Sequence, residues 1–299
     1  MSEYSDASLV LLPKGVKDGK LYSQKPLDGT GDFTVSRNTD ATYVDKNGVI
    51  QTAPPNVARI DYTDGGCGAL LVEPQSTNLV TYSEDFSNAI WLKSGVTVTP
   101  NSIISPNGNL TADKIVETTD NVLYGVYRNI PSTGTYTHSI FAKAGERTWM
   151  RMNLISGADS NIWFDLTNGV VGSNPNGFTY EIINYGNGWF KYSVTRINAA
   201  TSFTTFIPST GDGDTTYTGD GTSGIYIFGA SLKVNTDYSS YIPTQGSTVT
   251  RLADVVTATV PSGVTEIIET IDNVEQAPIT VIPTTYQIPN GNINKVIMK

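Results

Sequence analysis

The sequence contains a single cysteine, Cys67, and a single histidine, His138. One cysteine cannot form an intrachain disulfide or a cysteine-based zinc cluster, and one histidine excludes every multi-histidine metal site. Long apolar runs are also missing. The longest, Leu9–Leu12 and Ala69–Val72, are far shorter than the roughly 18 residues that a membrane-spanning helix needs.

Positive charge is scarce, since 19 basic residues stand against 28 acidic ones and the net charge is −9. A protein that follows the phosphates of a nucleic acid needs a cationic surface, so we expect no nucleic-acid binding. The first residues, MSEYSDASLV, are acidic and polar rather than basic and then apolar. They do not resemble a secretory signal, and we expect synthesis and folding in a cytoplasm.

Glycine (28), proline (15) and tyrosine (16) are plentiful, and they surround short runs rich in β-branched and aromatic residues. Strands that recur this often between turn residues are typical of a β-sandwich or barrel. We therefore predict an all-β protein whose central domain, residues 66–250, is a β-sandwich. The expected strands are Val122–Ile130, Thr135–Lys143, Trp149–Ile155, Asn161–Leu166, Phe178–Ile183, Phe190–Ile197, Ser202–Ile207 and Gly224–Val234.

The two flanking segments are too small or too polar to form cores of their own. Residues 1–65 have many turn signals and few apolar residues, which favours an extended N-terminal arm on a neighbouring surface. In residues 251–299, Val264, Ile267, Ile268 and Ile271 have helical spacing, but the Thr, Val and Ile content favours β-structure. We expect a small C-terminal β segment that packs on the sandwich or on other copies of the chain.

No catalytic group can be identified. His138 lies in an alternating strand, which favours a structural histidine, and Cys67 has no basic neighbour that would lower its pKa. The glycine-rich turn Gly211–Asp214 is acidic and would repel phosphate. It matches no known calcium loop, so we expect no cofactor, with structural Ca²⁺ as a minor alternative. We expect no enzyme activity.

Alternation in two neighbouring strands nominates one binding surface. Met150 and Met152 belong to the core side of their strand, as do Ile162 and Phe164 of the next strand. A loop at residues 156–160 would place Arg151 opposite Asp165 and Asn153 opposite Trp163. The outer face would then present the candidate glycan-binding residues Trp149, Arg151, Asn153, Trp163 and Asp165.

Two indoles beside polar planar groups suit a sugar ring, whose C–H face packs on aromatic rings while its hydroxyls form hydrogen bonds. The alternative is that the arm, the C-terminal segment or a neighbouring chain covers these tryptophans. Trp189, which follows Gly186-Asn187-Gly188, is expected to pack at the edge of the sandwich.

Several stretches resemble known proteins. Tyr136–Gly145 (YTHSIFAKAG), Gly188–Val194 (GWFKYSV) and Gly224–Val234 (GIYIFGASLKV) resemble strands of jelly-roll carbohydrate-binding modules. Stretches before them are similar to a preface found in bacteriophage fibre and spike proteins: Pro26–Arg37 (PLDGTGDFTVSR), Ala41–Ile50 (ATYVDKNGVI), Ala58–Tyr62 (ARIDY) and Leu70–Trp91 (LLVEPQSTNLVTYSEDFSNAIW). The last run is the most specific.

The resemblance implies a jelly-roll sandwich in a structural protein of the virion, such as a head or tail fibre, a spike or a decoration protein. It implies assembly with other virion proteins and with other copies of the chain, as in a homotrimer, and contact with host surface glycans. The alternatives are an adhesin module that acts chiefly in host adsorption and, less favoured, a polysaccharide depolymerase. Related modules often hold a structural calcium near the first strand. Glu84, Asp85 and Asn88 could contribute here, although Ala230-Ser231 stands where an acidic ligand is expected.

Overall fold

The computed structural model describes residues 4–12, 16–17, 20–25, 33–122, 125–130, 133–154, 160–199 and 202–299. Within these ranges every regular element is a β-strand, which confirms the predicted all-β class. None of the described segments is a helix long and apolar enough to cross a membrane. The chain divides into two compact units. We call Met1–Ser76 together with Arg251–Lys299 the terminal unit, and Thr77–Thr250 the insert unit.

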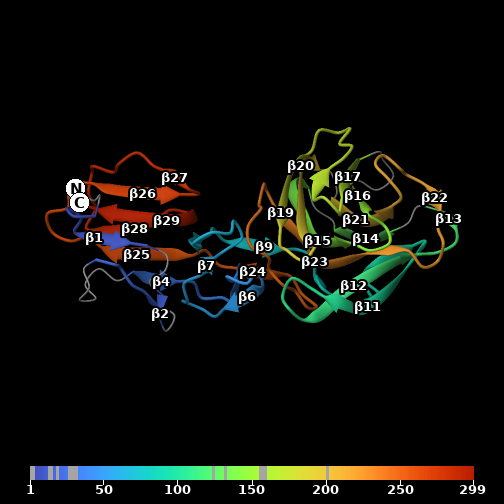
Figure 1. The fold of residues 1–299 in the computed structure, drawn as a ribbon, viewed down its shortest axis with the longest axis horizontal. Helices are drawn as coiled ribbons and strands as arrows, with labels where there is room; N and C mark the ends of the chain where they lie inside the picture. Colours follow the sequence, from blue (N-terminus) through green and yellow to red (C-terminus); the bar gives the residue numbers. More distant parts are fainter. Residues whose placement is uncertain are drawn as a thin grey trace. The chain divides into compact units, whose positions relative to one another are not determined.

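The insert unit contains two six-stranded antiparallel sheets (Figure 1). In order across the first sheet, the strands are β10 (Leu92–Ser94), β14 (Gly125–Ile130), β21 (Ser202–Ser209), β16 (Trp149–Asn153), β17 (Asn161–Asp165) and β18 (Val170–Val171). Across the second they are β11 (Val96–Ile104), β12 (Leu110–Glu117), β23 (Gly224–Val234), β15 (Gly134–Ala144), β20 (Phe190–Ala199) and β19 (Thr179–Asn184). A short pair, β13 (Asn121–Val122) and β22 (Tyr217–Thr218), completes the unit.

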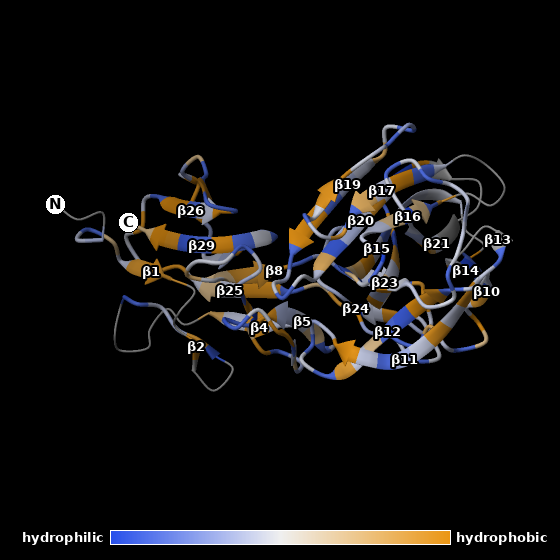
Figure 2. Ribbon diagram, turned by 45° about the vertical axis from the view of Figure 1, so that its right-hand side comes forward, coloured by the Kyte–Doolittle hydropathy of each residue, from blue (hydrophilic) through white to orange (hydrophobic). Residues whose placement is uncertain are grey.

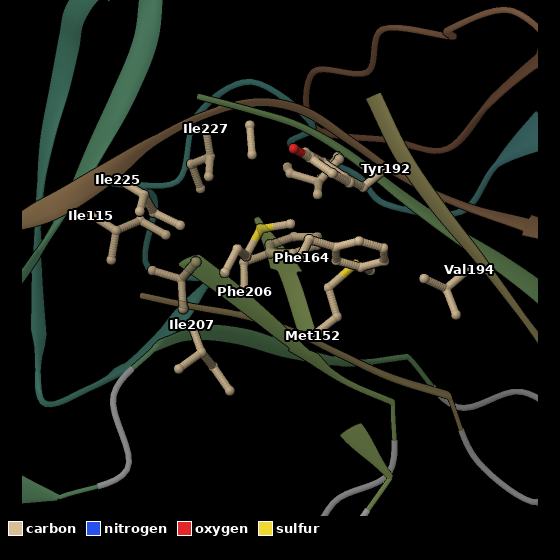
Figure 3. Packing of buried hydrophobic residues seen from close by; sticks show 14 of the residues in the cluster. Ile115, Met152, Phe164, Tyr192, Val194, Phe206, Ile207, Ile225 and Ile227 are labelled. Carbon is tan, nitrogen blue, oxygen red and sulfur yellow. The ribbon is translucent and has the colours of Figure 1, made fainter. Parts of the chain in front are cut away.

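Both sheets contribute side chains to one buried hydrophobic cluster, which is consistent with a β-sandwich. Hydrophobic and hydrophilic residues are mixed along strands such as β12, where Ile115 joins this cluster while charged residues lie on both sides of it (Figure 2). Figure 3 shows members of the cluster from the two sheets: Ile115, Tyr192, Val194, Ile225 and Ile227 from one, and Met152, Phe164, Phe206 and Ile207 from the other.

The terminal unit is built from strands of both ends of the chain (Figure 1). Its largest sheet has the order β27 (Val274–Glu275), β26 (Ile267–Ile271), β29 (Gly291–Met298), β8 (Ala69–Val72) and β7 (Ile60–Asp61), with β1 (Leu9–Leu11) also paired to β29. A second sheet has the order β28 (Thr285–Gln287), β25 (Val255–Thr259) and β4 (Thr34–Ser36). The remaining pairs are β5 (Ala41–Val44) with β6 (Ile50–Ala53), and β2 (Val16–Lys17) with β3 (Lys20–Leu21). The chain leaves and re-enters the unit through two paired strands, β9 (Ser76–Asn78) and β24 (Val249–Arg251).

This arrangement corrects the expected division into an arm of residues 1–65, a sandwich of residues 66–250 and a separate C-terminal segment of residues 251–299. The described parts of the two ends pair with each other, β1 with β29 and β4 with β25, and they bury one shared core. Each end has too few apolar residues for a core of its own, but together they have enough. The C-terminal segment therefore packs on the N-terminal one, within the same chain.

The β interpretation of the C-terminal segment is confirmed, because Ile267, Ile268 and Ile271 all lie in β26. Ile267 and Ile268 are adjacent, point to opposite faces of the strand and are both buried, in two different clusters. A strand covered on both faces has apolar residues in immediate succession, and this succession produced the helix-like spacing.

Five charged side chains form a buried network in the terminal unit. Arg37 donates to Asp254 (2.7 Å), and Glu73 accepts from both Arg59 (2.7 Å) and Arg251 (2.7 Å). Arg59 also pairs with Asp254. Burial alone would lower the pKa of Arg59, but the charges of Glu73 and Asp254 outweigh it and raise that pKa. The network therefore joins the N-terminal segment, the end of β8 and the chain just after β24.

Candidate functional site

The predicted glycan-binding residues lie on β16 and β17, two neighbouring strands of the insert unit. The core assignment of these strands is confirmed, because Met150, Met152, Ile162 and Phe164 are fully buried in the shared hydrophobic cluster. Alternation then places all five candidates, Trp149, Arg151, Asn153, Trp163 and Asp165, on the opposite face of this sheet.

The predicted cross-strand pairing is wrong by two residues. Arg151 lies opposite Trp163, Trp149 opposite Asp165, and Asn153 opposite Asn161. Leu154 N–H donates to Ser160 O (3.0 Å), so position 154 lies opposite position 160 and not opposite 162 as predicted. In the neighbouring pair, Asn153 Nδ2 donates to Asn161 Oδ1 (2.8 Å). The expected loop at 156–160 lies mostly outside the described residues. A shift of two residues keeps each side chain on its face, so the candidates remain together.

The face that carries them is largely covered. Arg151 and Trp163 are only 2% and 4% exposed, and the Arg151 guanidinium lies over the Trp163 ring at 5.9 Å. Trp163 Nε1 donates to the backbone carbonyl of Asp214 (3.0 Å). Part of the cover is therefore the acidic turn of the same unit, a segment that was not among the expected covers.

Asp165 does not pair with Arg151 across the strands. Its carboxylate accepts from the backbone N–H of Thr167 (2.8 Å) and from Asn168 Nδ2 (2.7 Å), which fixes the turn after β17. Trp149 and Asn153 are half-buried, so they and Asp165 form the accessible remainder of the predicted face.

The acidic turn at Gly211–Asp214 uses its carboxylates internally. Asp212 Oδ1 accepts from Ser173 N–H (2.7 Å), and Asp214 Oδ2 accepts from the Thr210 hydroxyl (2.6 Å). Throughout the described part of the chain, no three His, Cys, Asp or Glu side chains gather as metal ligands do. No local pattern in the sequence marked this turn as a cover, because its contact with Trp163 joins positions 51 residues apart.

Of the residues nominated for a structural calcium, Asn88 contributes its backbone carbonyl to the binding of an ammonium group instead. Lys93 Nζ donates to the backbone carbonyls of Ser87, Asn88 and Trp91, each at 2.9 Å. Asp85 accepts from Asn88 N–H (3.0 Å) and closes the turn. Because a lysine already supplies the positive charge here, the residues do not fit a calcium ion.

Glu84, the third nominated residue, points elsewhere and accepts a hydrogen bond from the Tyr241 hydroxyl (2.9 Å). Burial raises the pKa of Glu84, and the hydrogen bond only partly offsets this. Glu84 therefore belongs to the packing of Tyr241.

His138 is fully buried, and burial, together with the charge of Arg196, lowers its pKa to about 3. The ring is neutral at pH 7 and has no access to a substrate. Trp189 is 3% exposed, and its Nε1 donates to Ile104 O (3.1 Å), as suits an indole packed where strands end.

Comparison with known proteins adds no family. A scan of the chain against protein-family models finds no match, and a search of the curated proteins finds none either.

Proposed function

We propose that the chain is a structural protein of a bacteriophage particle, a head or tail fibre, a spike or a decoration protein. The terminal unit would hold it in the virion, and the insert unit would be displayed. The proposal rests on the stretches that resemble fibre and spike prefaces, above all Leu70–Trp91, which begins in β8 of the terminal unit and ends in the insert unit. The observation that carries it is the insertion. Both ends of the chain belong to one unit, so that unit can attach while the other stays free of chain ends.

The insert unit is proposed to be a jelly roll. Support comes from strand order, since β12, β23, β15 and β20 are neighbours in one sheet, and β14, β21, β16 and β17 in the other. Along the chain, connections pass repeatedly between the two sheets, and β12, the first of these eight strands, pairs with β23, the last. Two such interleaved Greek keys define the jelly-roll arrangement.

Contact with host surface glycans is proposed for the accessible remainder of the outer face around Trp149, with Asn153 and Asp165 beside it. A half-buried indole offers a ring edge and part of a face to a sugar, and the two polar side chains can pair with hydroxyls. A glycan array compares the wild type with Trp149→Ala and with Tyr180→Ala, which removes an aromatic ring that is 40% exposed elsewhere. Binding that survives Trp149→Ala unchanged refutes this site.

The proposed partners are other virion proteins and other copies of the chain in a homotrimer, and the proposed location is the outside of the virion. The expectation that each end of the chain needs a partner molecule no longer supports the trimer, because the two ends fold on each other. Cryo-electron microscopy of purified particles, with mass spectrometry of their proteins, tests the location. Light scattering of the isolated chain tests the trimer. Absence from the particle refutes the virion role, and a monomer at high concentration refutes the trimer.

A further inference from the structure

The terminal unit contains a pocket of about 410 Å³ next to the end of β7. This volume lies within the range of about 300–1,000 Å³ that is usual for small-molecule sites. Its lining comes from the N-terminal strand region, the loop between β7 and β8, and the C-terminal strands: Leu12, Asp61, Asp64, Gly65, Gly66, Cys67, Gly68, Ala69, Asn273, Asn292 and Asn294.

One wall is the glycine-rich loop of residues 64–68. Gly65, Gly66 and Gly68 all have left-handed φ angles, at 71°, 72° and 74°. At Gly68 a Cβ would also lie 2.7 Å from the Tyr62 ring, so only glycine fits there. The N–H groups of Gly66 and Cys67 donate to no described residue, which leaves them available to a ligand.

Three asparagines also line the pocket. Asn292 and Asn294 flank the buried Ile293 on β29, and both line the pocket, with Asn294 at an irregularity in the pairing of β29 with β26. Asn294 Oδ1 accepts from the backbone N–H of Asn273 (2.7 Å), which fixes the turn that brings Asn273 to the pocket. The side-chain amide groups of Asn292 and Asn273 and the carboxylate of Asp64 form no hydrogen bond with any described residue.

The charge of the lining excludes one class of ligand. Asp61 and Asp64 are acidic and none of the described lining residues is basic, so these side chains would repel an anion such as a phosphate or a uronate. Asp61 uses both oxygens within the protein, on Val44 N–H (2.7 Å) and Thr63 N–H (2.8 Å), and therefore holds the loop rather than a ligand.

The polarity of the lining excludes a second class. Among the lining residues that the structure describes, Leu12 and Ala69 alone have aliphatic side chains and none has a ring, which does not suit a lipid or a flat aromatic molecule. Amides, a carboxylate and open peptide N–H groups together both donate to and accept from hydroxyl groups. We propose that this pocket binds a small neutral saccharide or amino sugar. The inference stands apart from glycan contact at Trp149 and does not depend on the virion role.

Cys67 makes the test direct, because it is the only cysteine of the chain, is exposed and lines the pocket. The rate of its alkylation by iodoacetamide is measured by intact mass, with and without added glucose, galactose, mannose, N-acetylglucosamine, glucosamine and their common disaccharides. Glucuronate and CaCl₂ are separate arms. At a saccharide concentration about ten times Kd, occupancy should slow alkylation about tenfold.

Two variants and one control decide whether the protection is local. Asn292→Ala and Asp64→Asn should abolish the protection, whereas Asn47→Ala, an exposed asparagine outside the lining, should leave it intact. Calorimetric titration of Cys67→Ser with the protecting sugar should still show binding, which keeps the test valid if a wall variant fails to fold. The proposal is overturned if no neutral or amino sugar protects Cys67, if glucuronate or Ca²⁺ protects equally well, or if the wall variants are protected like the wild type.

Discussion

At the scale of single residues, Glu73 has the most demanding position in the terminal unit. Its Oε2 accepts from the guanidinium groups of Arg59 and Arg251, and all three side chains are at least nine-tenths buried. Buried charges cost free energy to desolvate, so such a group is tolerated only while its partners remain. The residue lies in the run LLVEPQSTNL. Its partners in three dimensions, 14 and 178 positions away, could not be read from that run.

Glu73→Gln keeps the shape of the side chain and removes its charge, leaving two buried arginines short of a counter-charge. We expect the free energy of unfolding of the terminal unit to fall by about 3–5 kcal/mol, measured by urea denaturation. The control is Glu275→Gln, whose 59% exposed carboxylate pairs with Lys295 at the surface and should cost less than about 1 kcal/mol. Equal losses in the two variants would contradict the role of the buried network.

His138 predicts a dependence of stability on pH. Its pKa is about 3 in the folded chain, against about 6.5 when unfolded, so between these values only the unfolded state binds the proton. Acid therefore favours unfolding, and the histidine should cost about 1.4 kcal/mol per pH unit as pH falls from about 6 to 4. Unfolding curves of wild type and His138→Gln at several pH values should show the shallower slope for the variant. Parallel slopes would disprove this.

At the scale of elements, the buried face of a strand could be predicted from the sequence better than the residues that pair with it across the sheet. The alternation that buries Met150, Met152, Ile162 and Phe164 was readable because it repeats every second residue within one strand. The register of β16 on β17 could not be read in this way, because it depends on the length of the loop between the two strands. Leu154 bonds to Ser160, two positions before the partner that was predicted. The cover over Trp163 also escaped prediction, since it comes from a polar turn about fifty positions away.

That cover can be tested through one hydrogen bond. Trp163→Phe keeps a ring in place but removes the N–H that holds the Asp214 carbonyl at 3.0 Å. We expect a loss of about 0.5–1.5 kcal/mol and faster hydrogen exchange in residues 210–216, measured by mass spectrometry. The matched variant Trp189→Phe, whose indole N–H donates to Ile104 O instead, should leave exchange in that turn unchanged. Unchanged exchange in Trp163→Phe would show that the turn is held by other contacts.

The turn before β10 depends on Lys93. Lys93→Met would leave three carbonyl oxygens without the ammonium that they share, at an expected cost of about 1.5–3 kcal/mol in thermal unfolding. Lys143→Met, which removes a donor to the single carbonyl of Asn187, should cost less. Because the lysine supplies the charge, neither EDTA nor Ca²⁺ should move the melting temperature of the wild type. A shift with calcium would contradict this interpretation.

At the scale of the whole molecule, the division into units follows from pairings that no local pattern contains. Short strands near each end of the chain were recognisable, but their pairing joins residues as distant as Leu9 and Met298. The expectation therefore placed the N-terminal segment on a neighbouring surface and the C-terminal segment on the sandwich or on other copies of the chain, whereas the two ends pair with each other. The all-β class needed only local patterns and could be predicted.

The insertion itself predicts that the insert unit folds alone. Its first and last residues, Thr77 and Thr250, are joined by a hydrogen bond between their hydroxyls (2.8 Å), so excising residues 77–250 leaves no strained end. We expect the fragment to unfold in one cooperative transition with the near-UV circular dichroism of a packed core. A fragment that is soluble only as a molten, dye-binding state would show that it needs the terminal unit.

The paired strands β9 and β24 have a consequence for how such a chain can change. The chain enters and leaves the insert unit through these two neighbouring strands. A different domain whose ends lie similarly close together can therefore replace the whole insert unit at these two points, while the terminal unit keeps all of its internal contacts. Related chains could in this way differ in the whole insert unit and still share the same terminal unit.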